Sequence, residues 1–463
     1  MDAPTQALVD YTLSVTPESM STDTIYQAIR HHLDGIGCAA GGFSSEPVTI
    51  LRNMAASAPQ TKGCTTYGVA DLTVPEFAVM ANCSANRHLD YNDTGLANVG
   101  GHPNDMTPAI FSAVEMIGGS GMDLIFATHV GYEACAGFVS AYPGRNDGWD
   151  QGTHIAMGTV AAVGRLFGLN ADQLANAFSL ALMPGAPLRV VRCGELSHWK
   201  GCATAHAAMT AFYAVRMAQL GMTGPSEPFT GQDAFFKVIS RREFEIDKIG
   251  KLQFGLPAID RTYFKYFPTE YNSQATVTGV LGMRDKFKLE DVESIHIATY
   301  WLSWHEIGGG QGDVEEKWDP QTREGADHSL PYLVAAVLVD GKVTLDSFTT
   351  ERVRDPALRP LMNKITISVD DEIEARFRAK RETGSRITVT LKDGTTIVEE
   401  AWHPRGSVKN PMTDDELNQK FDSMIGRVLD PAGAQSLRDD LWKLDKLDSL
   451  GSLTANFRSW TNR

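Results

Sequence analysis

Apolar side chains recur at helical spacing through most of the first half of the chain. Residues 23–40 place them every three or four positions, which gives a helix one apolar face, and Gly41 and Gly42 then signal its end. Residues 199–220 form a longer stretch of the same kind, rich in alanine and closed by Gly221. This pattern predicts helices that pack closely through small side chains.

Capping residues mark further helix starts. Thr107 precedes a proline, which predicts an N-cap with proline at the first helical position. Asn170 with Gln173, and Thr413 with Glu416, have the spacing of capping boxes. Because the last pair lies far from the first helical region, we expect the chain to return to helices near its C-terminal end.

The pattern becomes strand-like in the second half of the chain. Alternating or β-branched runs occupy residues 293–301, 364–370 and 386–401. The last run contains an Asp-Gly pair at 393–394, which predicts a hairpin. A helix is expected over residues 329–340.

These elements predict two domains. The expected fold is mainly α, with a large all-helical domain formed by residues 1–267 and 406–463 and a smaller α+β domain inserted at residues 268–405. A chain of 463 residues is long enough to bury more than one core. Its 43% hydrophobic and 21% charged residues are ordinary for a folded protein.

Charge and cysteine content narrow the expected partners. The 42 basic and 57 acidic residues give a formal net charge of −15 without a basic stripe, so we expect no nucleic acid partner. Six scattered cysteines lack a CxxC pair, so no metal is expected and buried thiols in a reducing cytoplasm are favoured. We see no signal peptide and no apolar run long enough to span a bilayer, so no membrane partner is expected and the predicted location is cytoplasmic.

The segment HLDYNDTGLANVGGHPNDMTPAI, residues 88–110, interrupts the helical pattern. Asp90 and Asp93 stand beside Thr94, and His102 follows a glycine-rich bend. Carboxylates, a hydroxyl and a histidine near a helix N-terminus suit proton transfer and carboxylate binding. An ordinary turn with capping side chains explains the same residues.

A second polar segment is LRVVRCGELSHWKGCATAH, which begins at residue 188. It concentrates Arg189, Arg192, His198 and Lys200 in an otherwise acidic chain. Lys200 opens a helix, where a cation opposes the helix dipole, and this indicates a role beyond local stability. A solvated positive loop is the alternative.

Two further histidines are candidates. In ADHSLPYLVAAVLVDG, His328 and Tyr332 can face a cleft. Helix capping by Asp327 or Ser329, with core packing, explains the same pattern. His154 precedes a helix of small residues, where a lone histidine is more often structural than catalytic. No dinucleotide, phosphate-loop, zinc or nucleophile-elbow motif occurs in its required context, so no cofactor is expected.

Five segments in order carry a resemblance to a known family. They read HLDYNDT…GGHPNDMTPAI, WKGCATAHAAMTAFYA, GMTGPSEPFTG, KYFPTEYNSQATV and EKWDPQTREGADHSLPYLVAAVLVDGKV. Together they resemble the MmgE/PrpD family, which includes 2-methylcitrate dehydratase, cis-aconitate decarboxylase and iminodisuccinate epimerase. The resemblance runs roughly from residue 23 to residue 425. It implies an all-helical domain with an inserted α+β domain, usually in a homodimer, and no metal or organic cofactor.

The resemblance also implies a chemistry and the residues that perform it. The family moves a proton at a carbon alpha to a carboxylate, which needs a base and stabilisation of the negative charge that develops. The expected catalytic residues are Asp90, His102, Lys200, His154 and Tyr332. The expected residues for a small anionic carboxylate substrate are Thr94, Arg189, Arg192 and His328. Which residue acts as base and which as acid is left open.

Departures from the family pattern bear on the reaction. Decarboxylase-like members have a histidine after the K-x-F-P motif, where this chain has Asn272 and Gln274. The segments FPTEYNSQATV and KWDPQTREGADHSLPY look closer to the 2-methylcitrate dehydratase branch. We therefore expect a lyase that dehydrates a 2-methylcitrate-like hydroxy acid. Decarboxylation of cis-aconitate and epimerisation of an acidic substrate are the alternatives, and a non-catalytic helical scaffold is least favoured.

Overall fold

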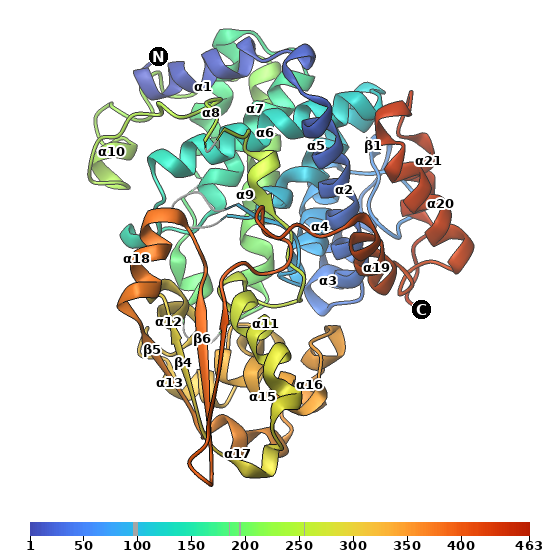
Figure 1. The fold of residues 1–463 in the computed structure, drawn as a ribbon. Helices are drawn as coiled ribbons and strands as arrows, with labels where there is room; N and C mark the ends of the chain where they lie inside the picture. Colours follow the sequence, from blue (N-terminus) through green and yellow to red (C-terminus); the bar gives the residue numbers. More distant parts are fainter. Residues whose placement is uncertain (96–100, 185, 194–195, 254) are drawn as a thin grey trace. The chain divides into compact units, whose positions relative to one another are not determined.

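The computed structural model describes residues 1–95, 101–184, 186–193, 196–253 and 255–463. It is mainly helical with a small sheet, as the sequence predicts (Figure 1). The chain divides into two compact units. The helical unit comprises Met1–Val191, Gly201–Tyr263 and Thr413–Arg463, and the α+β unit comprises Arg192–Lys200 and Phe264–Met412.

The helical unit contains the longer helices. They are α1 (Ala3–Ser14), α2 (Thr22–Gly42), α3 (Glu46–Ala56), α4 (Pro75–His88), α5 (Thr107–Ile117), α6 (Gly121–Ala141), α7 (Gly152–Leu166), α8 (Ala171–Leu182), α9 (Trp199–Gln219, from Gly201 on), α10 (Phe235–Val238), α19 (Asp414–Ile425), α20 (Pro431–Trp442) and α21 (Gly451–Arg458). Helix α6 packs along α7, and α2 contacts both α4 and α19. Strand β1 (Pro59–Cys64) and the pair β2 (Thr94–Gly95) and β3 (Thr262–Tyr263) complete the unit.

Helix α2 ends at Gly42, as the glycine pair predicts. A Cβ added to Gly42 would lie 2.4 Å from the Ala85 carbonyl oxygen of α4, and one on Gly41 would lie 2.6 Å from Leu89. Real Cβ atoms essentially never lie this close to another heavy atom, so these glycines allow α2 to contact α4 and the residue that follows it. The predicted end of the helix is confirmed, and close packing gives a further reason for glycine at this place.

Three predicted helix starts can be compared with the structure. Asn170 and Thr413 each cap a helix through a reciprocal capping box, as predicted. Thr107 does not cap α5, because the 3-10 turn Pro103–Met106 runs directly into that helix. The Thr107 hydroxyl instead donates to the Asn104 carbonyl at 2.9 Å. The predicted N-cap was wrong because a preceding helical turn occupies this end of the helix.

Helix α6 is long and apolar enough to cross a membrane by length and composition, so the expectation that no such run exists was wrong. However, 89% of its apolar window is buried inside the protein. The helix packs against α7, α2 and α5. Burial on all sides is itself a sufficient reason for an apolar sequence.

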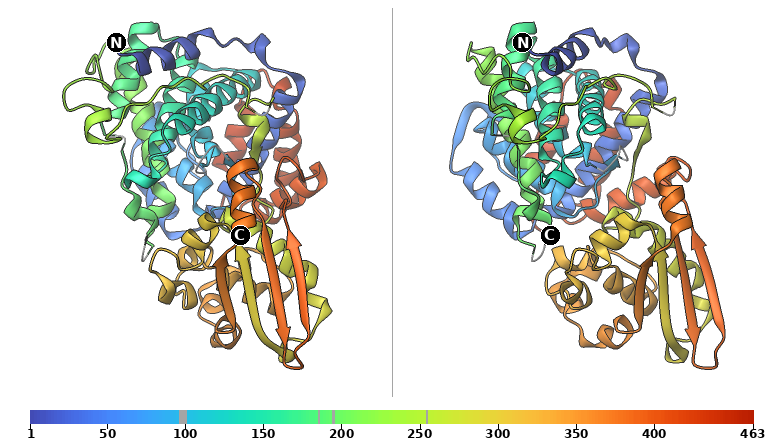
Figure 2. Two further views of the ribbon diagram at one scale, coloured as in Figure 1. Left: turned by 60° about the vertical axis from the view of Figure 1, so that its left-hand side comes forward. Right: turned by 90° about the vertical axis from the view of Figure 1, so that its left-hand side faces the viewer.

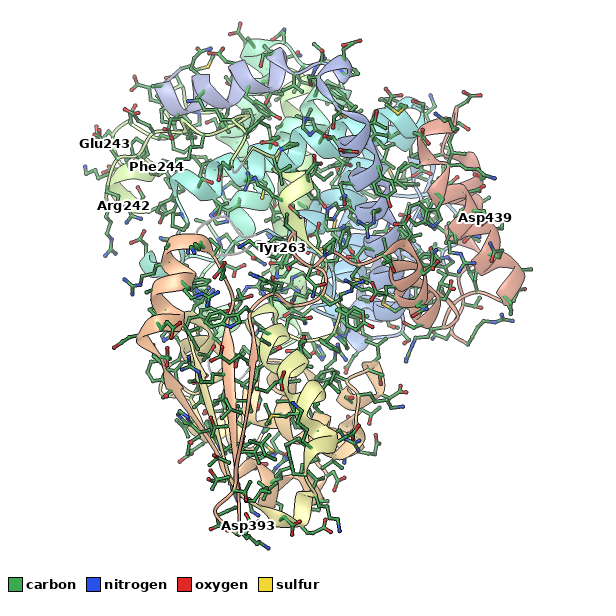
Figure 3. All side chains as sticks on the ribbon, viewed as in Figure 1. Arg242, Glu243, Phe244, Tyr263, Asp393 and Asp439 are labelled. Carbon is green, nitrogen blue, oxygen red and sulfur yellow. The ribbon has the colours of Figure 1, made fainter. Side chains whose placement is uncertain are left out.

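The α+β unit is built on a four-stranded sheet in the order β5-β4-β6-β7. Its strands are β4 (Val292–Thr299), β5 (Ile365–Val369), β6 (Ser385–Leu391) and β7 (Thr396–Ala401). Strand β5 is parallel to β4, whereas β6 is antiparallel to β4 and β7. The predicted hairpin is confirmed: Gly394 has φ 85°, and Asp393, at the hairpin tip in Figure 3, accepts the Thr395 N–H at 2.8 Å.

The main core of this unit lies on one face of the sheet, where its helices gather (Figure 2). Ile295 and Ile297 of β4 and Ile387 of β6 are fully buried there with residues of α11 and α15. The helices of the α+β unit are α11 (Gln274–Met283), α12 (Trp301–Ile307), α13 (Val314–Trp318), α14 (Arg323–Ala326), α15 (Leu330–Asp340), α16 (Thr350–Val353), α17 (Arg359–Met362) and α18 (Asp371–Lys380). Helix α18 packs in a second, smaller cluster with Ala298 and Tyr300. Ser329 caps α15 by accepting the Tyr332 N–H at 3.1 Å.

Candidate active site

Asp90 has an unusual backbone conformation. It follows the end of α4 at His88, and its φ of 51° lies in the left-handed region of backbone conformation. Few residues other than glycine adopt this region, although asparagine and aspartate do so more often than most. Asp90 is 2% exposed, and its carboxylate lies 2.6 Å from Arg87 Nη1. The turn directs this carboxylate back over the last turn of the helix, and conformational strain of this kind is concentrated at functional sites.

Arg87 joins two acids in the interior of the helical unit. Its Nε lies 3.4 Å from Asp105 Oδ2, and its Nη1 contacts Asp90. Asp105 also accepts a hydrogen bond from Asn92 at 2.7 Å. Because an arginine carries its charge at any ordinary pH, it balances the buried carboxylates permanently. We call Arg87, Asp90, His102 and Asp105 the loop cluster.

His102 is positioned for proton transfer. Its Nδ1 lies 2.6 Å from the Asp93 carbonyl oxygen, which can only accept, so Nδ1 is assigned the proton. Nε2, 3.6 Å from Asp90 Oδ1, then presents a lone pair. The side chain remains 12% exposed, unlike the acid beside it. A reachable, unprotonated nitrogen next to a carboxylate is a suitable proton acceptor, because the carboxylate stabilises the imidazolium that forms.

Asp93 has a structural role in this loop. It is fully buried, and its carboxylate accepts hydrogen bonds from the Tyr132 hydroxyl at 2.7 Å and the Asn104 N–H at 3.1 Å, with His31 Nδ1 at 2.8 Å. Burial and the nearby Asp93 charge raise the pKa of Tyr132 well above its ordinary value. The phenol therefore stays protonated as a donor, and the network fixes the carbonyl that orients His102.

The C-terminal segment also supports the loop. Lys420 of α19 donates to the Tyr91 carbonyl at 2.8 Å and pairs with Asp34 of α2 at 2.6 Å. The lysine nitrogen also lies 3.8 Å from the centre of the Tyr91 ring. A residue more than three hundred positions further along the chain thus holds the backbone next to Asp90.

Thr94 lies at the end of the same loop, in β2. Its partner in β3 is Tyr263, and the next residue, Gly95, donates its N–H to the Gly101 carbonyl at 2.7 Å. Thr94 is 3% exposed, and among the residues that the structure describes its hydroxyl makes no hydrogen bond. The hydroxyl is therefore available to a ligand. The rest of the glycine-rich bend, residues 96–100, lies outside the described residues.

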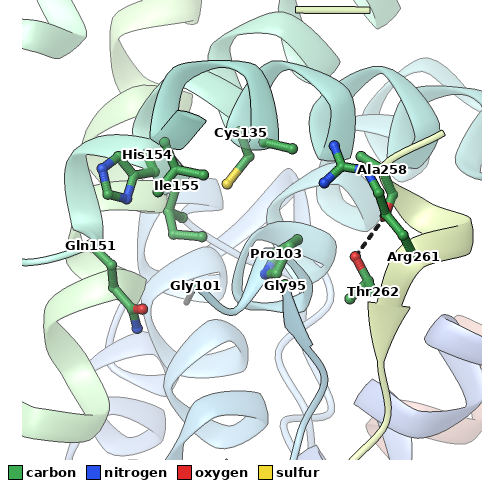
Figure 4. Close-up of a pocket in the computed structure, with 12 residues that line it drawn as sticks. Gly95, Gly101, Pro103, Cys135, Gln151, His154, Ile155, Ala258, Arg261 and Thr262 are labelled. Carbon is green, nitrogen blue, oxygen red and sulfur yellow. Dashed lines mark hydrogen bonds between the residues drawn. The ribbon is translucent and has the colours of Figure 1, made fainter. Parts of the chain in front are cut away.

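His154 lines a pocket of the helical unit (Figure 4). It is 3% exposed, and its Nε2 lies 2.9 Å from the Tyr142 carbonyl oxygen, to which it donates. Burial lowers the pKa of His154 to about 4, against the smaller effects of that hydrogen bond and of Asp150. The imidazole is therefore neutral near pH 7, which disfavours it as a general acid there. Its catalytic role stays a prediction.

In the α+β unit, Lys200 meets two residues that are distant in sequence. Its Nζ donates to Asp327 Oδ1 at 2.8 Å and lies 3.0 Å from His328 Nδ1. Asp327 and His328 also contact each other directly. Lys200 stands in the first turn of α9, and the carboxylate offsets the unfavourable interaction of a cation with that end of the helix dipole. We call Lys200, Asp327 and His328 the lysine cluster.

Tyr332 is packed in the core of the same unit. It is fully buried, and its hydroxyl donates to the Ser347 carbonyl. Burial raises the pKa of Tyr332 above its ordinary value, so the phenol stays protonated. These contacts fit a structural role, and the predicted catalytic role stays a prediction.

The two arginines of the second polar segment stand at the two ends of one 3-10 turn. Arg189 begins a 3-10 turn, Arg189–Arg192, and its backbone N–H donates to Gly148 at 2.9 Å. Arg192 Nη1 lies 3.5 Å from the Lys200 carbonyl oxygen, within the α+β unit. Residues 194–195 of this segment lie outside the described residues. Carboxylate binding by the two arginines stays a prediction.

Three residues of these clusters were not recognised from the sequence. Arg87 stands three positions before Asp90, which is one helical turn and was a usable signal. Asp105 has no such local signal. Asp327 was considered only as a capping residue, whereas it holds Lys200. A pair separated by 127 positions cannot be recognised from spacing.

These features define an enzyme-like protein in which buried carboxylates are paired with histidine and fixed cations. Residues 6–247 match the MmgE/PrpD N-terminal domain, and residues 267–445 match the MmgE/PrpD C-terminal domain. The chain therefore belongs to the MmgE/PrpD family.

Several curated enzymes are similar to the chain over most of its length. A 2-methylcitrate dehydratase from Cupriavidus necator is 26% identical over 421 residues, 86% of this chain and 84% of that protein. An alkylcitrate dehydratase from a fungal species is 27% identical over 90% of this chain and 87% of its own. Human cis-aconitate decarboxylase is 24% identical over 94% of this chain and 90% of its own.

Proposed function

We propose that this protein is a cytoplasmic, homodimeric hydro-lyase that dehydrates a small hydroxy polycarboxylate of the 2-methylcitrate type. The observation that carries the proposal is the Asp90–His102 pair: a reachable imidazole nitrogen beside a carboxylate held at φ 51°. The named dehydratases that match most of the chain support the same reaction class.

In the proposed reaction, His102 Nε2 removes the proton on the carbon alpha to a carboxylate, and Asp90 stabilises the imidazolium. The carbon–hydrogen electron pair forms the new double bond as the carbon–oxygen bond breaks. The leaving hydroxyl takes up a proton from the imidazolium, so that water and an alkene result. Lys200 binds a substrate carboxylate and stabilises the charge that develops on it, and Thr94 donates to a substrate oxygen.

Decarboxylation is the weaker alternative because of Asn272. Its Oδ1 accepts from the Tyr300 hydroxyl at 2.5 Å, and its Nδ2 donates to Glu270 at 2.7 Å. An amide in these two hydrogen bonds does not exchange protons near neutral pH. The histidine that the resemblance implies for decarboxylase-like members is therefore not replaced by a group with the same chemistry.

The reaction is tested by proton NMR of the purified protein in D2O with 2-methylcitrate, citrate, cis-aconitate and substituted succinates. We expect an alkene from 2-methylcitrate or a close analogue. Loss of carboxylate from cis-aconitate would establish the decarboxylase instead. Deuterium at an alpha carbon with nothing eliminated would establish an epimerase. No change with any hydroxy acid rejects the proposed substrate class.

The role of Lys200 has its own test. Lys200→Ala should slow turnover by roughly 10²–10³-fold, the usual effect of removing one donor to a developing negative charge. Lys237, whose side chain is 67% exposed and pairs with Asp233, provides the control variant Lys237→Ala, which should keep full activity. A folded Lys200→Ala protein with wild-type turnover contradicts the assignment.

A further inference from the structure

Arg261 stands next to the candidate site without having been assigned a role. It ends the 3-10 turn Ile259–Arg261 and directly precedes β3. Strand β3 pairs with β2, the strand that carries Thr94, in the register Thr94 with Tyr263 and Gly95 with Thr262. The backbone of Arg261 is therefore fixed beside the loop that carries the proposed catalytic residues.

The guanidinium of Arg261 has no partner within the described ranges. Its Nε is buried without a hydrogen bond, and the side chain forms no ion pair there. The charge of Glu133 acts on it, but Glu133 is engaged by the Ala258 N–H. Burial lowers the pKa of Arg261 from its ordinary value. Arg261 is half-buried, and a guanidinium whose buried Nε–H meets no acceptor favours an anion that can accept from it.

The pocket that Arg261 lines lacks any such anion in its described lining. Arg261 carries its one ionised side chain, because His154 is neutral, and the remaining wall is apolar or uncharged, including Cys135, Val139 and Ile155. In Figure 4 the arginine side chain and His154 stand at opposite ends of this wall. A single positive charge surrounded by low-polarity side chains attracts an anion strongly.

The size of the pocket limits what enters it. Its internal volume is about 20 Å³, close to what one ordered water needs. It therefore admits the end of a ligand and not a whole polycarboxylate. Gly95 and Gly101 line the same pocket and adjoin Thr94 and His102 in the chain. The rest of the ligand would then lie toward Thr94 and His102.

We propose that Arg261 is a specificity-determining residue that binds one carboxylate of the substrate in this pocket. The proposal rests on the proposed function for the identity of the substrate, a polycarboxylate. An arginine suits the task because its planar fork binds both carboxylate oxygens at once. The carboxylate that Arg261 binds is a different one from the carboxylate assigned to Lys200. The substrate is therefore bound through two of its carboxylates.

The test measures binding without turnover. Tricarballylate has three carboxylates but no hydroxyl to eliminate, so its affinity can be measured by isothermal titration calorimetry with the full chain. Arg261→Gln should raise its Kd at least about tenfold, the usual effect of losing a charge-assisted hydrogen bond. Arg261→Lys should show a smaller increase. The control is Arg242→Gln, since Arg242 is half-exposed and pairs with Asp147 at 2.9 Å, and this variant should bind like the wild type.

A stability readout separates ligand binding from a structural role. Without ligand, Arg261→Gln should melt no lower than the wild type, because within the described ranges the arginine side chain forms no hydrogen bond or ion pair that the variant would lose. With tricarballylate, the wild type should gain more in Tm than the variant. Equal affinity in Arg261→Gln and the wild type, no binding by the wild type, or a lower Tm of the ligand-free variant would overturn the proposal.

The two proposals fail in different ways. If Arg261-dependent binding occurs but 2-methylcitrate is not dehydrated, the carboxylate site stands and the dehydratase assignment is rejected. If dehydration occurs with an unchanged KM in Arg261→Gln, the carboxylate site is rejected and the dehydratase assignment stands.

Discussion

The loop cluster takes its residues from one short stretch of chain, whereas the lysine cluster joins positions far apart in sequence. Arg87, Asp90, His102 and Asp105 all lie within the end of α4 and the loop after it. Lys200 reaches Asp327 and His328 across 127 and 128 positions. Each cluster nevertheless combines a carboxylate, a histidine and a cation. The difference shows that similar chemistry can be encoded locally or only through the tertiary fold.

The cation also differs between the two clusters. Arg87 cannot lose its proton under ordinary conditions and is 2% exposed, so it balances Asp90 and Asp105 as a fixed part of the interior. Lys200 is a compact ammonium with rotatable donors, which suits the binding of a substrate oxygen. We infer that arginine organises the loop cluster, while lysine acts on the ligand.

The largest expected effect is on kcat, and it should differ between the histidines of the two clusters. His102→Asn should lower kcat by roughly 10²–10⁴-fold, because asparagine cannot accept the proton. His328→Asn should mainly raise KM, because His328 is expected to help bind substrate and the amide still offers Lys200 an acceptor. Steady-state kinetics with 2-methylcitrate would show the split. Equal losses of kcat in the two variants would mean that both histidines transfer protons, and the comparison would fail.

The next effect is on the free energy of unfolding, and it compares the cations of the two clusters, Arg87 and Lys200. Arg87→Met leaves two buried carboxylates without their partner and should cost about 3–5 kcal/mol of unfolding free energy. Lys200→Met should cost less, since it leaves one buried carboxylate, Asp327, rather than two without a cation. Urea unfolding at pH 7 gives both values. A smaller loss for Arg87→Met than for Lys200→Met would show that the arginine does not organise the loop cluster.

Most helices and strands were predictable from the sequence because they depend on local patterns. The capping box at Asn170 and the Asp393-Gly394 hairpin rest on side-chain spacing and turn geometry, and both are present. An error arose where the surrounding structure changed the meaning of a local signal. Thr107 reads as a cap but follows a 3-10 turn that runs directly into the helix.

The candidate site was predictable only in part for the same reason. Asp90, Thr94 and His102 form a visible sequence motif. The sequence could not show that Asp93 supports the loop while Asp90 adjoins His102, since burial and hydrogen bonding distinguish the two acids. Arg261 belongs to no sequence motif. Its proposed role depends on the pocket that it lines and on a buried Nε without a hydrogen bond, both of which exist only in the folded chain.

The third effect tests how precisely α4 positions the loop cluster. Gly42→Ala would place a Cβ 2.4 Å from the Ala85 carbonyl of α4, so the helix must shift. We expect a loss of about 1–3 kcal/mol in unfolding free energy, together with reduced kcat, because Arg87 and Asp90 move with the helix. Thermal unfolding and turnover would be measured on the same samples.

The matched control for this variant is Gly394→Ala in the α+β unit. It strains a backbone with φ 85° but meets no atom within 4 Å, at the hairpin tip. It should cost stability of about 1 kcal/mol without changing kcat. If Gly42→Ala lost stability but kept full kcat, the packing of α2 on α4 would not be what positions the loop cluster.

The smallest effect distinguishes His154 from the histidines that adjoin carboxylates. Burial lowers the pKa of His154 to about 4 in the folded chain, below the ordinary value of 6.5. The unfolded chain therefore binds the proton first as pH falls. The contribution of His154 to the free energy of unfolding is fully present above about pH 6.5 and is lost toward pH 4.

Between pH 7.5 and 5.5 this residue should account for a loss on the order of 1 kcal/mol in the free energy of unfolding. His154→Gln, measured by urea unfolding at both pH values, should lose that much less than the wild type, while His32 and His129 contribute equally to both proteins. An identical pH dependence would show that His154 is not the neutral, buried histidine described here and would restore it as a candidate acid.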